Sequence, residues 1–196
     1  MRLILLGPPG AGKGTQAALV SAAHGVPAIS TGDIFRANIK GQTPLGLRVK
    51  EITATGGYVP DEITNAIVRD RLAQDDAAAG FLLDGYPRTT GQVEALDEML
   101  GDTGHALDAV IELTVDTDEV VQRLLARAQE QGRADDTEDV IRERMRLYAE
   151  ETAPLAAVYA DRGLLHRVDG MGSVEDVTAR IAAVLDVAPG DASGSR

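Results

Sequence analysis

Short runs of apolar, β-prone residues alternate along this chain with longer segments in which apolar residues recur at helical spacing. Five of the short runs predict strands, at Arg2–Leu6, Ala28–Ser30, Gly80–Asp84, Asp108–Thr114 and Leu164–Asp169. Their apolar residues are nearly continuous rather than alternating, which is typical of parallel strands that helices cover on both faces. The pattern therefore predicts an α/β fold of three layers around a five-stranded parallel sheet.

Helices are predicted between these strands and after the last of them. The predicted helices are Lys13–His24, Gly32–Lys40, Leu45–Thr55, Asp61–Ala73, Gly91–Leu100, Thr117–Ala128, Thr137–Arg162 and Ser173–Val187. Asp61, Thr117 and Ser173 are of types that cap helix N-termini, so we expect each to begin its helix.

Two segments do not fit a simple alternation of strand and helix. About fifty residues separate the second and third predicted strands, too many for one crossover helix, and residues 30–59 predict a small helical domain. The polar segment Gln129–Asp136 predicts a mobile loop over a site. Residues 188–196 are rich in Gly, Ser and Asp without periodicity, so we expect a disordered tail.

Composition narrows the classes of function. The chain has 196 residues and is 44% hydrophobic, enough for a full core, but its net charge of −12 argues against nucleic acids and anionic membranes as partners. It has no cysteine, which excludes disulfides, thiolate catalysis and cysteine-ligated zinc. The apolar run Leu3–Leu6 is too short for an export signal or a membrane span, so we expect a cytoplasmic protein.

The strongest local motif follows the first predicted strand and opens a helix. Its sequence is Gly7-Pro8-Pro9-Gly10-Ala11-Gly12-Lys13-Gly14-Thr15. This context predicts a phosphate-binding loop, in which backbone N–H groups and the helix N-terminus face a phosphate and Lys13 adds a formal charge. Gly14 stands where the usual pattern has Ser or Thr, so we expect no direct protein ligand to Mg²⁺ there. The alternative is a glycine-rich turn that binds nothing.

A second polar cluster follows the third predicted strand, which ends in Asp84. Ligands of open α/β sheets bind at the carboxyl ends of the strands, so Asp84 is expected near the magnesium and phosphates of a nucleotide. Gly85 and Pro87 favour a turn that brings Arg88 and Gln92 to the same crevice. Alternatively, Asp84 only starts a turn and Arg88 is a surface charge.

Four arginines flank the polar loop of residues 129–136. They are Arg123, Arg127, Arg133 and Arg144. Three of them share helical faces with apolar residues, where an arginine either covers the core with its stem or serves a ligand. Their grouping around one loop favours a ligand, whereas Arg142 and Arg146 lack this placement and predict a solvated face.

Together these motifs resemble the adenylate kinase family. The resemblance rests on motifs in the family's order from about Met1 to about Val187: G-x-x-G-x-G-K-G-T, Ser30-Thr31-Gly32-Asp33, Arg36, Asp84-Gly85-Tyr86-Pro87-Arg88 with Gln92, and Thr152-Ala153-Pro154-Leu155. It implies a P-loop NTPase-type core of residues 1–30, 60–126 and 134–187. It also implies a nucleoside-monophosphate-binding domain at 30–59 and a short lid at 127–133.

The resemblance implies a role for each matching residue. ATP would be bound by Gly10, Ala11, Gly12, Lys13, Gly14, Thr15, Arg127 and Gly172. AMP would be bound by Thr31, Arg36, Gly57, Tyr58, Val59, Gly85, Tyr86, Pro87, Arg88, Gln92, Arg133 and Arg144. Catalysis would depend on Lys13, Asp84, Arg88, Arg123, Arg127, Arg133 and Arg144.

The implied reaction is reversible phosphoryl transfer from Mg-ATP to AMP, giving two ADP, for adenine nucleotide homeostasis. Such a transfer needs no general base because the phosphate of AMP is already ionised, and we expect His24, His105 and His166 to be structural or exposed. The implied partners are ATP, AMP and ADP, with Mg²⁺ held by phosphates and water, Asp84 in its outer sphere, and no zinc. We expect a monomer.

Three other functions stay open at this point. A kinase for pyrimidine monophosphates would share the fold, although Thr31 and Gln92 favour adenine. A kinase for a small alcohol would need a base near the hydroxyl. A P-loop switch ATPase would act on a protein partner and would hydrolyse ATP regardless of AMP.

Overall fold

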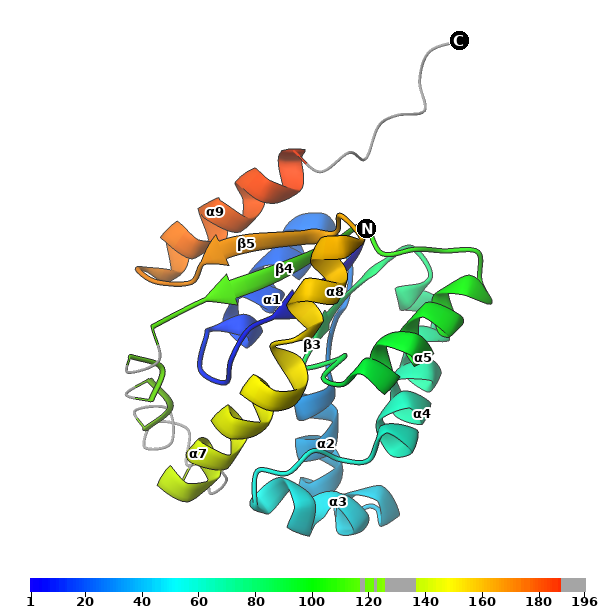
Figure 1. Ribbon diagram of the computed structural model, residues 1–196. Helices are drawn as coiled ribbons and strands as arrows, with labels where there is room; N and C mark the ends of the chain where they lie inside the picture. Colours follow the sequence, from blue (N-terminus) through cyan, green and yellow to red (C-terminus); the bar gives the residue numbers. More distant parts are fainter. Residues whose placement is uncertain (117–118, 122, 126–136, 188–196) are drawn as a thin grey trace.

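The computed structural model describes residues 1–116, 119–121, 123–125 and 137–187. Its centre is a parallel sheet of five strands in the order β2-β3-β1-β4-β5 (Figure 1). The strands are β1 (Arg2–Leu6), β2 (Ala28–Ser30), β3 (Phe81–Asp84), β4 (Ala109–Thr114) and β5 (Leu165–Asp169). All five predicted strands are confirmed, and the last three begin one residue later than expected.

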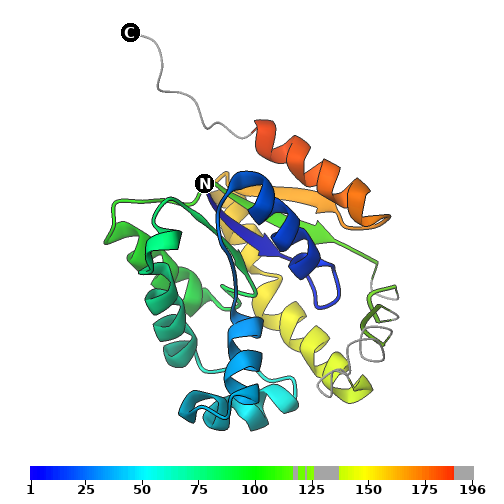
Figure 2. The same cartoon turned by 180° about the vertical axis from the view of Figure 1, so that it is seen from behind.

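Helices cover both faces of the sheet, as the continuous apolar strands predicted. One face is covered by α1 (Lys13–His24) and α9 (Val174–Val187), and the other by α4 (Asp61–Leu72), α5 (Thr90–Gly101) and α8 (Leu155–Asp161) (Figures 1 and 2). β1 serves both cores because successive side chains of a strand point to opposite faces. Leu3 and Leu5 pack in the core under α1 and α9, whereas Ile4 and Leu6 pack in the other.

The segment between β2 and β3 carries α2 (Thr31–Lys40) and α3 (Pro44–Ala54), which lie beside the layers with their own cluster around Phe35 and Val49. Thr43 caps α3, since its hydroxyl oxygen accepts the N–H of Gly46 at 3.0 Å. A Cβ on Gly46 would lie 2.1 Å from the carbonyl oxygen of Asn38, so only glycine allows this approach of the two helices. The domain boundaries assigned from the sequence stay predictions.

The single helix predicted over Thr137–Arg162 is wrong. α7 (Glu138–Leu147) runs into a π-helical turn, η2 (Tyr148–Thr152), and α8 begins after Pro154. Pro154 has no N–H to continue the helical ladder, and the N–H of Ala153 bonds to the carbonyl of Tyr148, five residues back.

Capping was predicted correctly for Ser173 and wrongly for Asp61. The oxygen of Ser173 accepts the N–H of Asp176 at 3.1 Å. At α4 the capping position is Pro60, which has no capping side chain, and Asp61 lies inside the helix with its carboxylate bonded to Thr89 and Gln92. A local sequence pattern does not predict these partners, because they lie 28 and 31 residues further along the chain.

Some predicted features fall outside the described residues. They are part of the predicted helix Thr117–Ala128, the lid at 127–133 with Arg127 and Arg133, the loop Gln129–Asp136 and the tail 188–196. Residues 119–121 and 123–125 are helical. Within the described ranges, no helix combines the length and the apolar character that crossing a bilayer requires.

Candidate active site

A cavity of about 1050 Å³ opens at the carboxyl edge of the sheet. β1 has β3 on one side and β4 on the other, and the loop that follows it enters this cavity, at the kind of topological switch point where α/β folds bind ligands. The walls come from the loop before α1, from α2, α3 and α7, and from the segment after β3. Two nucleotides are within the usual capacity of a cavity of this size.

The loop between β1 and α1 has the conformation of an anion site. Gly10 and Gly12 have φ angles of +83° and +88°, which favour glycine. A Cβ on Gly10 would also lie 2.9 Å from Cγ of Leu124, so the loop packs directly against the helical residues 123–125. Gly12 occupies the N-cap of α1 without a capping side chain, which leaves the first N–H groups of this helix to a ligand.

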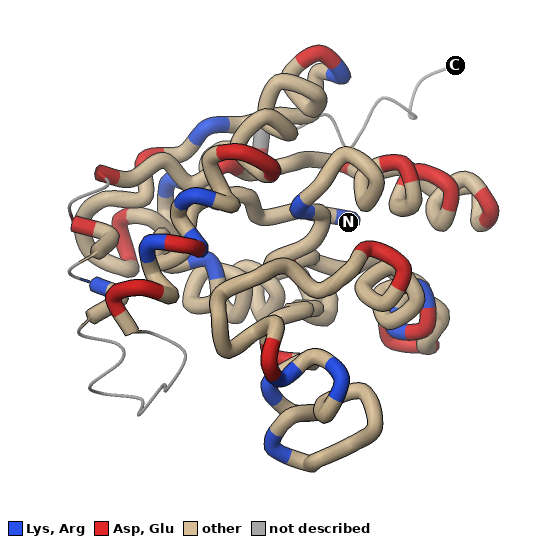
Figure 3. Tube along the Cα trace, turned by 60° about the horizontal axis from the view of Figure 1, so that its bottom comes forward, with Lys and Arg blue, Asp and Glu red and all other residues tan. Residues whose placement is uncertain are grey.

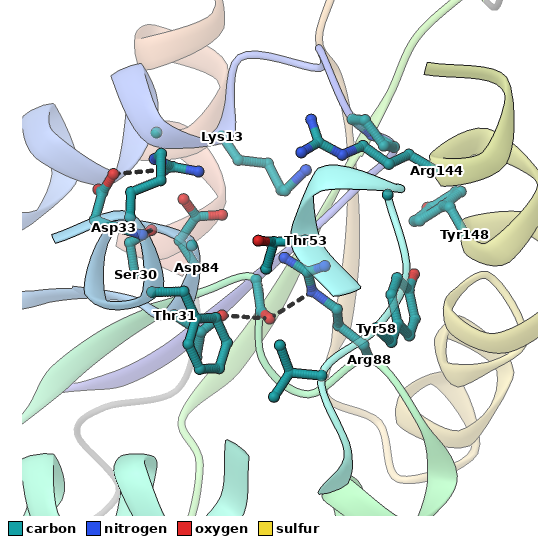
Figure 4. Close-up of a pocket in the computed structure, with 18 of the residues that line it drawn as sticks. Lys13, Ser30, Thr31, Asp33, Thr53, Tyr58, Asp84, Arg88, Arg144 and Tyr148 are labelled. Carbon is teal, nitrogen blue, oxygen red and sulfur yellow. Dashed lines mark hydrogen bonds and ion pairs between the residues drawn. The ribbon is translucent and has the colours of Figure 1, made fainter. Parts of the chain in front are cut away.

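Lys13 lies at the start of α1 with its ammonium over the loop. Its Nζ donates to the carbonyl oxygens of Gly7 and Pro8 at 2.7 and 2.9 Å. Figure 4 shows the side chains of Lys13, Arg88 and Arg144 pointing into the same space from three different elements. A phosphate oxygen in that space would compete with the two carbonyls for the ammonium.

Arg88 is held in the cavity by a hydrogen bond and an aromatic ring. Its Nε donates to the carbonyl oxygen of Gly85 at 2.8 Å, and its Cζ lies 5.0 Å from the centre of the Tyr58 ring. Burial away from water is the main cause that lowers the pKa of its guanidinium. The electrostatic influence of Tyr58 and Asp84 raises this pKa, whereas the positive charges of Arg144 and Arg36 lower it further. Like charges held together away from water favour binding of an anion between them.

The turn after β3 joins Arg88 to Thr31. The hydroxyl of Thr31 donates to the same Gly85 carbonyl at 2.8 Å. Gly85 has a φ of +76°, and a Cβ there would lie 3.0 Å from both Oγ1 of Thr31 and Nη2 of Arg88. Gly85 therefore permits the close packing that places Thr31 and Arg88 at one wall of the cavity.

The π-helical turn η2 is hydrogen-bonded to the backbone of Arg88. The hydroxyl of Thr152 in η2 donates to the backbone carbonyl of Arg88 at 2.9 Å, and Oη of Tyr58 lies 2.9 Å from Oγ1 of Thr152. Since the single hydrogen of Thr152 is used on Arg88, the hydroxyl of Tyr58 must be the donor in the second bond. The sequence motif around Thr152 was noted, but its contact with Arg88 depends on a turn that no periodicity predicts.

Arg36 and Asp84 occupy the α2 and β3 sides of the cavity. Nη2 of Arg36 pairs with Oδ1 of Asp33 at 2.5 Å, an exposed pair that a phosphate can displace at little cost. Asp84 ends β3 beside the start of α1, where a Cβ on Gly14 would lie 3.9 Å from its Oδ2. Asp84 thus faces the phosphate loop, as its position at the end of the strand predicted.

The charge of the cavity is opposite to that of the chain. Acidic positions are spread along several outer helices (Figure 3), in keeping with the net charge of −12. Within the described part of the chain, seven cations line the cavity against the two carboxylates of Asp33 and Asp84. The cations are Lys13, Arg36, Lys40, Lys50, Arg88, Arg123 and Arg144.

Most of the predicted site residues line this one cavity. They are Gly10, Gly12, Lys13, Gly14, Thr15, Thr31, Arg36, Gly57, Tyr58, Val59, Asp84, Gly85, Pro87, Arg88, Gln92, Arg123 and Arg144. Ala11 and Tyr86 are instead buried in the two cores, and Gly172 lies against Asp176 and Arg180 at the start of α9. The roles of Arg127 and Arg133 fall outside the described residues.

Several lining residues were missed by the sequence analysis. Lys40, Lys50 and Tyr148 belong to no motif and reach the cavity only through the packing of α2, α3 and η2 around it. Arg142 and Arg146 face solvent in ion pairs with glutamates on their own side of the helix, as predicted.

Among the described residues, no histidine lines the cavity and no cluster of metal-ligating side chains is found. His24, His105 and His166 are not among its lining residues. No group of three or more Asp, Glu or His residues with the geometry of a metal site occurs among the residues that the structure describes. Among the described residues, the cavity offers backbone amides, hydroxyls, ammonium and guanidinium groups, and the carboxylates of Asp33 and Asp84.

Comparison with known proteins gives one consistent result. The family model described as adenylate kinase matches residues 5–164. An adenylate kinase of Nocardioides sp. is 62% identical over 189 residues, 96% of this chain and 99% of the relative. An adenylate kinase of Kocuria rhizophila is 62% identical over 94% of this chain and 98% of its own length. One of Thermobifida fusca is 55% identical over the same shares.

Proposed function

Because the chain belongs to the adenylate kinase family and transfers a phosphoryl group reversibly from ATP to AMP, we propose how its own residues divide this work. ATP binds with its phosphates on the loop Gly7–Thr15. AMP binds between α2, the segment after α3 and the turn after β3. The two nucleotides meet end to end, and the product on each side is ADP.

The observation that carries this division is the grouping of cations in one cavity. Seven Lys and Arg side chains from separate elements converge there although the chain as a whole is strongly acidic. Two polyanions repel each other, so their approach requires compensating positive charge that is already in place. A site for a single phosphate would not require so many cations.

On the ATP side, the N–H groups at the start of α1 and the ammonium of Lys13 take the phosphates. Lys13 exchanges its bonds to Gly7 and Pro8 for bonds to phosphate oxygens. Arg123 reaches the same phosphates from the helical residues 123–125. The adenine contact of Gly172 and the ATP contact of Arg127 remain part of the proposal from the family resemblance.

On the AMP side, Arg36 and Arg88 take the phosphate. Thr31 and Gln92 read the base, and the backbone from Gly57 to Val59 lines the adenosine. Arg88 is positioned for this because its stem is bonded to Gly85 and its face rests on Tyr58, so little rotamer freedom is left to lose on binding.

The transfer itself is electrostatic. The phosphate of AMP carries no proton that a base must remove at neutral pH, which fits a cavity without histidine. Lys13, Arg88 and Arg144 point into one space from three different elements (Figure 4), and the proposal places the reacting phosphates of the two nucleotides there. A well-placed arginine on a transferring phosphoryl group is worth roughly 10³–10⁵ in rate. Arg133 is proposed to act there with Arg144.

The donor set also suits Mg²⁺ brought in with ATP. Asp84 and Thr15 lie at the phosphate loop, and a carboxylate with phosphate oxygens and water is the ligand set that Mg²⁺ prefers. We propose that Asp84 acts through coordinated water, and that the ion, when bound, neutralises charge on the β- and γ-phosphates.

We propose a cytoplasmic monomer because the chain is strongly acidic and has no cysteine. In the described part of the chain, the exposed large hydrophobic side chains are Met1, Leu19, Leu47 and Val174. None of them belongs to the predicted nucleotide-binding residues. Scattered exposed apolar residues are usual in monomers. Sedimentation at micromolar concentration checks the oligomeric state.

A substrate panel tests the proposed function. The purified protein with Mg-ATP is expected to form ADP from AMP at least about tenfold more efficiently than from CMP, UMP or GMP, since a site that hydrogen-bonds one base rejects others. A bis-adenosine polyphosphate is expected to compete with both substrates. Preference for a pyrimidine monophosphate would overturn the assignment of the acceptor, and hydrolysis of ATP unaffected by AMP would favour a switch ATPase.

The support of Arg88 by Tyr58 predicts a graded response. Replacement of Tyr58 by leucine removes the ring under the guanidinium and is expected to raise KM for AMP about tenfold, with a smaller change in kcat. Tyr58→Phe keeps the ring and loses only the bond to Thr152, so about a threefold rise is expected. Steady-state kinetics with AMP varied measure both. Equal effects of the two variants would contradict a role for the ring.

A further inference from the structure

The side-chain amide of Gln92 is held at both ends by other parts of the protein. Gln92 is 1% exposed and lies on α5 beside the cavity. Its Nε2 donates to Oδ1 of Asp61 at 2.7 Å, and its Oε1 accepts the backbone N–H of Arg88 at 2.7 Å. The amide is thus fixed between α4 and the turn after β3.

These two partners permit only one orientation of the amide. A carboxylate can only accept and a backbone N–H can only donate, so the nitrogen of Gln92 must face Asp61 and its oxygen must face Arg88. Reversing the amide would set oxygen against carboxylate and N–H against N–H. Each buried mismatch of this kind favours the observed orientation by roughly tenfold to a hundredfold.

Asp61 is itself held in place. Its second oxygen, Oδ2, accepts the hydroxyl hydrogen of Thr89 at 2.7 Å, and the oxygen of Thr89 caps α5 by accepting the N–H of Gln92 at 3.2 Å. A Cβ on Gly91 would lie 3.0 Å from Oδ2 of Asp61, so the backbone of α5 approaches this carboxylate closely. The carboxylate therefore connects the start of α4 to the start of α5.

An amide fixed in this way presents a defined pattern to a base. It has two N–H hydrogens and two carbonyl lone pairs, and its contacts with Asp61 and Arg88 use one of each. The proposal places the second donor and the second acceptor together on the edge of the amide that a base would meet. Adenine offers the complementary pair, a 6-amino donor beside the N1 acceptor, whereas hypoxanthine and guanine offer the reverse, an O6 acceptor beside an N1–H donor.

We propose that Asp61 is a positioning residue that sets the preference for adenine over 6-oxopurines by fixing the orientation of the Gln92 amide. This inference rests on the proposed placement of the AMP base at Gln92. Asp61 acts through Gln92 and makes no contact with the nucleotide. Its carboxylate acts together with the backbone N–H of Arg88 to select which of two hydrogen-bond patterns the site presents to the base.

The test compares AMP with IMP as phosphoryl acceptors, because the two differ at position 6 and N1 of the base. Asp61→Ala is expected to lower kcat/KM for AMP about tenfold, to lower it for IMP less, and so to reduce the AMP-to-IMP ratio at least about fivefold. Asp61→Asn keeps an oxygen that accepts from Gln92 and is expected to retain most of the ratio. KM for ATP stays within about twofold in both variants.

Two further variants separate specificity from stability and from the placement of the base. Glu62→Ala removes the neighbouring exposed acid of the first turn of α4 and is expected to keep the wild-type ratio and melting temperature. Gln92→Ala is expected to collapse the ratio. Parallel losses for AMP and IMP in Asp61→Ala, with a collapsed ratio in Gln92→Ala, would overturn the role of Asp61 alone. An unchanged ratio in Gln92→Ala would overturn the placement of the base as well.

Discussion

Replacement of Lys13 by alanine is expected to lower kcat by at least about a hundredfold. The ammonium is the formal charge nearest the start of α1, and its partners Gly7 and Pro8 belong to the loop proposed to hold the phosphates of ATP. Removing one preorganised donor from a phosphoryl-transfer site costs roughly 10²–10³ in rate, because no solvent molecule replaces it in the same geometry. Steady-state formation of ADP from saturating Mg-ATP and AMP measures the effect.

The fold is expected to survive this change. Nζ of Lys13 donates to two loop carbonyls at the edge of the cavity, and the side chain belongs to neither hydrophobic core. Circular dichroism and the melting temperature should therefore match the wild type within a few degrees. Arg142→Ala serves as the control, since Arg142 is an exposed cation paired with Glu138 on α7. Near-normal kcat in Lys13→Ala would refute the placement of ATP on this loop.

The second large effect is expected at Arg88. Arg88→Ala should lower kcat/KM for AMP by at least about a hundredfold and raise KM for AMP more than KM for ATP, because Arg88 belongs to the AMP side of the cavity. Arg88→Lys keeps a charge but lacks the planar fork and the Nε bond to Gly85, so it should recover only a small part of the loss. Varying each nucleotide at a fixed excess of the other separates the two KM values.

Two results would contradict this role of Arg88. One is an equal rise in the two KM values, which would mean that the variant disturbs the whole cavity rather than one nucleotide. The other is full activity of Arg88→Lys, which would mean that a point charge suffices.

Local sequence determines much of the architecture. The five apolar runs were correctly predicted to be strands, because a strand covered on both faces needs apolar residues at nearly every position. The boundary of the single helix over Thr137–Arg162 was missed because the alanine- and leucine-rich residues around Pro154 continue a helical pattern. The π-helical turn there is stabilised by tertiary contacts, among them Thr152 with Arg88.

The chemistry of the site divides in the same way. The loop Gly7–Thr15 was recognisable because its glycines, its lysine and its place between strand and helix are all local properties. The role of Asp61 was assigned wrongly as a helix cap, because its bonds to Thr89 and Gln92 span 28 and 31 residues of chain. Lys40 and Lys50, which also line the cavity, belong to no sequence motif that indicates a binding role.

The sequence by itself determined the strands, the phosphate loop and the kinds of side chain that the reaction needs, since these depend on spacing and on residue type over a few positions. Only the tertiary structure decided that Lys40 and Lys50 also line the cavity, and that Gln92 is held between Asp61 and Arg88. The physical reason is that such contacts come from the packing of helices against a common sheet edge. That packing depends on residues far apart in the chain, which no local pattern contains.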